Sequence, residues 1–78
     1  MIPPLFSRVV FTRAIPEEGI CPGDVGTIVE IHEDASGQVI GFEVELFSAS
    51  GDTLGVASVP VDAARPASPA DRLTTRVG

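Results

Sequence analysis

The residues of this chain that could do chemistry begin with a single cysteine and a single histidine. Cys21 lies beside Pro22 and Gly23, and a reactive thiol there would need a nearby cation or helix N-terminus. No basic residue is close in the sequence, so we interpret Cys21 as a small loop hydrophobe. His32 with Cys21 and one carboxylate would fall short of the four ligands of a structural zinc site. We therefore interpret His32 as a strand-surface residue and predict no metal or cofactor site.

Three glutamates, Glu30, Glu43 and Glu45, are expected on one outward face of a sheet. Carboxylates gathered in this way could bind a divalent cation or act as an acid/base pair. Catalysis would also need a concave, partly apolar pocket, which a domain of this size seldom encloses. We therefore predict a solvated face, no catalytic residue and no enzymatic activity. A non-catalytic subunit of a larger enzyme stays open as an alternative.

Phe47 is predicted to pair with Thr53 on the same outward face as these glutamates. An exposed aromatic side chain with an anionic rim is typical of a binding hot spot for a basic protein. In the alternative interpretation, the C-terminal tail covers this ring. The predicted partner-binding residues are Phe47, Glu45, Glu43 and Glu30.

The charges of the chain are strongly segregated, and the net charge is −6. The five cations are all arginines near the two ends: Arg8, Arg13, Arg65, Arg72 and Arg76. Between Ala14 and Ala64 there is no cation, and the carboxylates there are Glu17, Glu18, Asp24, Glu30, Glu33, Asp34, Glu43, Glu45, Asp52 and Asp62. Such an anionic body repels phosphate backbones and favours a basic protein partner, for example one encoded by a neighbouring gene, or simply solubility.

The length and composition predict one small cytoplasmic domain. Seventy-eight residues with 44% hydrophobic content are enough for one core and argue against disorder. A single cysteine excludes an internal disulfide and fits a reducing cytosol. The sequence has no secretory signal pattern and no apolar run near the roughly 18 residues that span a bilayer, so no membrane association is expected.

A glycine-rich turn that leads into a strand organises the chain. Pro22 suits the second position of a turn, and Gly23 suits the third, where φ is positive. Asp24 can accept backbone N–H bonds across this turn. Gly26 has no Cβ and so permits a close backbone approach where the strand begins.

Alternating apolar residues predict five strands. Residues 27–33 and 38–47 form a hairpin, in which Ile31 is expected opposite Ile40 and Val29 opposite Phe42. Residues 5–12 precede it, with Val9 in the core, and a long loop over 13–21 follows them. Residues 53–59 return beside the hairpin, and 60–66 give a turn with a last strand that closes a barrel. Residues 67–78 are expected to be a flexible tail.

This all-β pattern over residues 1–66 resembles the small five-stranded SH3-like barrel class. It also resembles a bacterial family of small stand-alone proteins of unknown function, with the signature G-L-x-x-G-D-x-G-T-V-V. The matching residues are Val9, Phe11, Pro16, Glu17, Gly19, Ile20, Gly23, Asp24, Gly26, Thr27, Ile28, Val29, Val44, Glu45, Leu46, Arg65 and Pro66. The resemblance covers residues 5–66 and implies a fold without implying an activity.

The same Gly-Asp-x-Gly arrangement is similar to the KOW motif of ribosomal and transcription proteins. This resemblance implies an alternative function, a nucleic-acid-associated module that acts through Arg8, Arg13 and Arg65. A KOW-type surface needs a basic stripe with stacking aromatic residues, whereas the central part of this chain carries only acids. A protein-binding module is therefore the first expectation.

Overall fold

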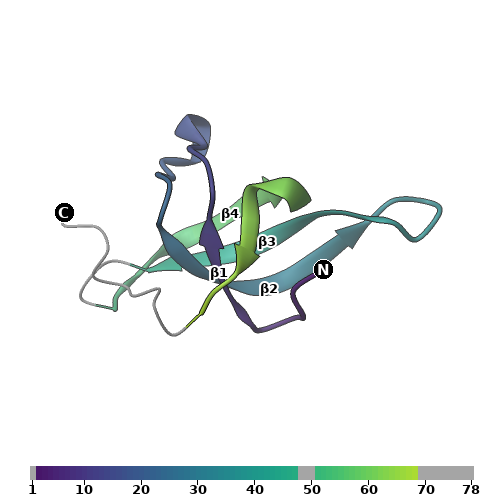
Figure 1. Ribbon diagram of the computed structural model, residues 1–78, viewed down its shortest axis with the longest axis horizontal. Helices are drawn as coiled ribbons and strands as arrows, with labels where there is room; N and C mark the ends of the chain where they lie inside the picture. Colours follow the sequence, from purple (N-terminus) through teal and green to yellow (C-terminus); the bar gives the residue numbers. More distant parts are fainter. Residues whose placement is uncertain (1, 48–50, 69–78) are drawn as a thin grey trace.

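The computed structural model describes residues 2–47 and 51–68. In these ranges, five antiparallel strands form one sheet in the order β4-β3-β2-β1-β5 (Figure 1). The strands are β1 (Arg8–Phe11), β2 (Val25–Glu33), β3 (Val39–Phe47), β4 (Thr53–Pro60) and β5 (Ala64–Pro66). Two 3-10 helices, η1 (Pro16–Glu18) and η2 (Val61–Ala63), lie in the connections. No helix in the described ranges is long and apolar enough to span a bilayer.

The all-β prediction with five strands is confirmed, but the closed barrel is wrong. All three residues of β5 pair with β1, and β4 pairs with β3, so these two strands form opposite edges of an open sheet within the described residues. Among the described residues, no strand pairing joins β5 to β4, which is the contact that a closed barrel requires. Of the predicted tail, residues 69–78 lie outside the described residues.

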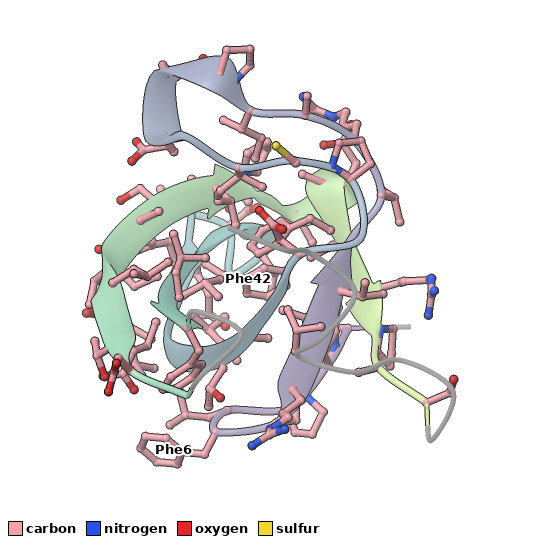
Figure 2. The ribbon with its side chains drawn as sticks, turned by 90° about the vertical axis from the view of Figure 1, so that its left-hand side faces the viewer. Phe6 and Phe42 are labelled. Carbon is pink, nitrogen blue, oxygen red and sulfur yellow. The ribbon has the colours of Figure 1, made fainter. Side chains whose placement is uncertain are left out.

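The core fills the inside of the curled sheet. Figure 2 shows Phe42 inside this curl, where its side chain is fully buried. The buried cluster consists of Val9, Phe11, Ile15, Ile20, Ile28, Phe42, Val44, Ala57, Val59 and Ala63. Truncation of a buried Phe to Ala typically costs about 3–5 kcal/mol, so these residues dominate the stability of a domain this small.

Three β-bulges set the register of the sheet. The pairing passes from Ile28 to Glu30 on β2, so Val29 is an extra residue there. Ile40 on β3 and Leu54 on β4 are extra residues at the other two register shifts. Each bulge adds one residue to one strand and bends it.

The predicted hairpin register is wrong because uniform alternation leaves no place for these bulges. Ile28 pairs with Val44, and Ile31 pairs with Phe42. Ile28 is fully buried, although alternation places it outward, whereas Ile40 is 52% exposed. The extra residue at position 29 allows Ile28 and Ile31, three positions apart, to face the same core.

Regular alternation from the Phe47–Thr53 pair predicts Val44 opposite Val56, and the bulge at Leu54 makes that register wrong. Val44 lies opposite Ala57, and Glu45 lies opposite Val56. Alternation without a bulge at Leu54 places Val56 in the core, but Val56 is 57% exposed. Val59 is buried opposite Phe42.

The turn before β2 is held by both backbone and side-chain hydrogen bonds. Gly23 has φ +90°, and the Asp24 N–H donates to the Cys21 carbonyl at 3.1 Å. Asp24 Oδ2 accepts the Cys21 N–H at 2.9 Å. The Gly23 N–H and the Asp24 carbonyl both bond the backbone of Phe11 at 2.8 Å. The turn is therefore fixed against the end of β1.

The β2–β3 hairpin extends beyond the other strands in Figure 1, and Asp34 organises its turn. Asp34 Oδ1 accepts hydrogen bonds from the Ser36 N–H, the Ser36 hydroxyl and the Gln38 N–H. These bonds, led by that of the Ser36 hydroxyl, lower the pKa of the Asp34 carboxyl. Gly37 completes the turn with φ +87°.

Gly26 lies where β2 passes close to β3. A Cβ at this position would lie 2.8 Å from the Glu45 carbonyl oxygen and would overlap the Val44 Cγ1 methyl. Because Gly26 does not have a positive φ, the requirement for glycine here is steric.

We predict that Gly26→Ala lowers the free energy of unfolding by about 1–3 kcal/mol, because the backbone carbonyl must move to admit the methyl group. Chemical denaturation measures this change. The control Glu17→Ala, on the exposed η1 turn, should change stability by less than about 0.5 kcal/mol. An equally small effect of Gly26→Ala would contradict the close approach.

Candidate protein-binding surface

The register brings the predicted glutamates together on the outward side of β2 and β3. Glu30 lies directly opposite Glu43. On β4, Ser58 lies opposite Glu43, and Val56 lies opposite Glu45. Along β3 and β4 these residues alternate with buried residues that face the core. The predicted grouping of the three glutamates on one face is therefore present in the structure.

Two strongly exposed apolar residues border these glutamates. Leu54 and Val56 on β4 are 64% and 57% exposed. We call Glu30, Glu43, Glu45, Leu54 and Val56 together the acidic face. Exposed aliphatic side chains beside carboxylates combine apolar contact area with a charge preference, which is the composition of many protein interfaces.

Glu43 is hydrogen-bonded to side chains on both neighbouring strands. Its Oε2 atom accepts a hydrogen bond from the Ser58 hydroxyl on β4 and lies 3.0 Å from His32 Nε2 on β2. The Ser58 hydroxyl, followed by the His32 ring, holds the pKa of the Glu43 carboxyl below its ordinary value. One carboxylate thus links three neighbouring strands.

These contacts also offset an unfavourable pair of charges. Glu30 and Glu43 are cross-strand neighbours, and like charges at such positions destabilise a sheet by roughly 0.2–1 kcal/mol. Hydrogen bonds from His32 and Ser58 keep Glu43 ionised beside Glu30. His32 therefore has a specific role on the strand surface, as a partner of Glu43.

Phe47 pairs with Thr53, as the sequence predicts, and its side chain is half-buried at the end of β3. Residues 48–50 beside it lie outside the described residues. Among the described residues, Leu54 and Val56 offer more exposed apolar surface on the acidic face than Phe47 does.

The most exposed aromatic residue is Phe6, which sequence reasoning missed. Phe6 is 70% exposed and projects away from the body of the domain (Figure 2). It is also the one non-glycine residue with positive φ, +67°, among the described residues. The Ser7 N–H and hydroxyl both donate to the Pro4 carbonyl, and the Phe6 N–H donates to the Ile28 carbonyl.

This geometry makes Pro4 to Ser7 a turn in which Phe6 occupies a position that favours glycine or asparagine. Alternation over residues 5–12 predicts a regular strand there, but β1 begins at Arg8. Proline and serine favour turns, so Pro4 and Ser7 are the sequence signal that could have identified this turn. Exposed Leu5 lies in the same turn.

The remaining chemical candidates stay separate in the structure. Cys21 is an exposed free thiol. In the part of the chain that the structure describes, no three His, Cys, Asp or Glu side chains are arranged to hold a metal ion. Of the arginines in the alternative nucleic-acid surface, Arg13 forms an exposed ion pair with Asp62 at 3.0 Å. Arg8 and Arg65 lie on the neighbouring strands β1 and β5.

We predict that Ser58→Ala raises the midpoint at which the Glu43 carboxyl titrates, and that His32→Ala raises it by less, because Ser58 lowers the pKa most. Carbon-detected NMR titration measures both. Since the folded pKa is lowered, the stability that Glu43 contributes is present above the ordinary glutamate pKa and is lost as the pH falls through the lowered value. The matched control Ser36→Ala should shift only the titration midpoint of the Asp34 carboxyl. An unchanged Glu43 midpoint in Ser58→Ala would exclude this bond.

We predict that Phe6→Ala changes the free energy of unfolding by less than about 0.5 kcal/mol, because the ring is exposed. Phe6→Asn should raise it by about 0.5–1 kcal/mol, because asparagine tolerates the left-handed backbone conformation. Urea denaturation of the three proteins distinguishes the two effects. A large loss of stability in Phe6→Ala would show that the ring is packed. No gain of stability in Phe6→Asn would show that the backbone at this position is relaxed.

Comparison with protein-family models matches residues 5–65 to a domain of unknown function, DUF4926. The curated proteins and the solved structures give no match to the chain. The family match covers most of the chain and nearly the same stretch, residues 5–66, over which the sequence resembles a family of unknown function. The chain belongs to the DUF4926 family.

Proposed function

We propose that this domain is a non-enzymatic module that binds a basic protein through the acidic face. The observation that carries the proposal is the pairing of Glu45 on β3 with Val56 on β4. This pair places a carboxylate directly beside an aliphatic side chain that is 57% exposed. Basic side chains with apolar neighbours would satisfy both groups at once.

The charge of the whole chain supports the same kind of partner. The net charge is −6, and the segment between Ala14 and Ala64, which contains β2, β3 and β4, has no Lys or Arg. A field of one sign steers oppositely charged proteins toward the surface and raises the rate of association. The half-buried Phe47, at the end of β3, would contribute at the border of this contact.

We also propose that the fold belongs to the SH3-like class and that the protein is bacterial and cytoplasmic. The strand order, the long connection between β1 and β2, and η2 immediately before β5 support the fold class. The exposed free thiol of Cys21 suits a reducing compartment. An accessory subunit of a larger assembly would use the same surface.

The experiment is capture of a partner by the immobilised full chain at low and at high salt, with identification of what is bound. We expect a basic protein whose capture falls as salt rises. Glu45→Lys and Val56→Asp should each weaken binding by roughly tenfold or more, as expected for the loss of a charge pair or an apolar anchor. The matched control Glu17→Lys makes the same charge change on η1 and should bind like the wild type.

Equal capture by Glu45→Lys, Val56→Asp and the wild type would overturn the proposed surface. The nucleic-acid alternative is tested in parallel by filter binding with RNA and DNA at low salt. Retention that falls steeply with salt and is lost in Arg8→Glu would favour that alternative. The Arg13–Asp62 ion pair argues against it, because it engages one of the three arginines with a carboxylate.

A further inference from the structure

β4 ends the sheet with an edge that no described strand covers. It pairs with β3 on one side, and within residues 2–47 and 51–68 no strand pairs with its other side. Its residues, Thr53–Pro60, include no charged side chain, although charges are a common protection of edge strands. From Gly55 to Pro60 the pairing with β3 has no register shift, because the bulge lies before it at Leu54. This regular part of the edge can pair with another extended segment through its backbone N–H and C=O groups.

Two carboxylates lie beside this regular part of the edge. Glu45 lies opposite Val56, and Glu43 lies opposite Ser58. The Glu43 carboxylate extends onto β4, because its Oε2 atom accepts a hydrogen bond from the Ser58 hydroxyl. A strand added beside β4 would lie about 4.8 Å further out. A long arginine or lysine side chain on its outward side can therefore reach the Glu43 carboxylate across the small Ser58 side chain.

The inward side of the same edge favours a different kind of side chain. Ala57 and Val59 are buried there as part of the core cluster. The neighbouring side chains of an added strand would continue this apolar row, and valine and threonine, which strands favour, suit such positions. Successive side chains of a strand point to opposite faces. The edge therefore matches a segment in which basic residues alternate with valine or threonine.

A second copy of this chain fits the edge less well than a basic segment does. Each copy carries a net charge of −6, and Thr53–Pro60 contains no Lys or Arg. Pairing of one β4 with another would therefore bring no cation to Glu43 or Glu45. Charge complementarity favours a segment that a basic partner supplies.

We infer that an extended segment of the basic partner pairs with β4 as an added strand, with arginine or lysine side chains on the side of Glu43 and Glu45. This inference rests on the proposed function and adds the way in which the partner is recognised. Backbone hydrogen bonds to residues 55–59 supply affinity, and the two carboxylates select the basic side chains. Salt weakens the charge pairs in this contact more than the backbone hydrogen bonds.

The probe is a peptide of about eight residues, blocked at both ends, in which arginine alternates with valine. Amide hydrogen exchange of the full chain, followed by NMR, measures its effect. We expect the β4 amides that are not bonded to β3 to exchange freely without peptide, and saturation with peptide to slow them by roughly tenfold or more. Edge amides that are already protected without peptide, binding that leaves them unprotected, or no binding at low salt would overturn the inference.

Two N-methylated forms of the probe separate backbone pairing from charge. One form carries the methyl groups on the arginine amides and the other on the valine amides, so both have the same charge. In an extended strand these two sets of amides point to opposite edges, and only one edge faces β4. We expect one form to bind like the parent peptide and the other to lose affinity by roughly tenfold or more. Equal affinity of the two forms would overturn the added strand.

A change in the domain tests the orientation of the segment. Glu45→Gln keeps the shape of the side chain and removes its charge, so it should weaken binding of the parent peptide by roughly two- to fivefold at low salt. The matched control Glu17→Gln makes the same change on η1 and should bind like the wild type. Wild-type affinity in Glu45→Gln would contradict the placement of the basic side chains beside this carboxylate.

The results with the probe and with the captured partner fail separately. Salt-sensitive capture of a basic protein that leaves the β4 edge amides unprotected would overturn the inference and leave the proposed function in place. Edge protection by the peptide in a domain that captures no basic protein would contradict the proposed function instead. Edge protection that rises with the concentration of the domain alone, together with a dimer by light scattering, would assign the edge to a second copy and overturn the inference.

Discussion

One extra residue in β2 sets the geometry of the whole domain. Ile28 and Ile31 are three positions apart, yet both face the same core, and this is possible because Val29 forms a bulge between them. The bulge bends β2, so the sheet curls around Phe42. Without it, the strand would send one of the two isoleucines into solvent or would bring Glu30 toward the core.

The outward surface follows from the same register. Once Ile28 pairs with Val44 and Ile31 pairs with Phe42, Glu30 must lie opposite Glu43 on the other side of the sheet. His32 and Ser58 both bond to one oxygen of Glu43, and these bonds offset the unfavourable proximity of the two carboxylates. The acidic face is thus a consequence of how the core is packed. Its apolar border on β4 arises in the same way, from the bulge at Leu54.

Much of this fold can be predicted from the sequence, because turns and alternation are local signals. The glycine-aspartate turn before β2, the hairpin turn at Asp34 and the five strands all follow from residue type and spacing. The bulges do not, because Val29, Ile40 and Leu54 are apolar and fit regular alternation as well as their neighbours do. Only packing decides that they are extra residues. For the candidate site, the grouping of the glutamates could be predicted, whereas the exposure of Val56 and the strained turn at Phe6 depend on register and tertiary hydrogen bonds.

The register of the β2–β3 hairpin is the central claim, and cross-strand nuclear Overhauser effects measure it directly. The structure predicts contacts between the backbone and side-chain protons of Ile28 and Val44, and between those of Ile31 and Phe42. Contacts of Ile31 with Ile40, and of Val29 with Phe42 as direct partners, would instead establish a hairpin without a bulge. In that case Glu30 would not lie opposite Glu43, and the arrangement of the acidic face described here would be wrong.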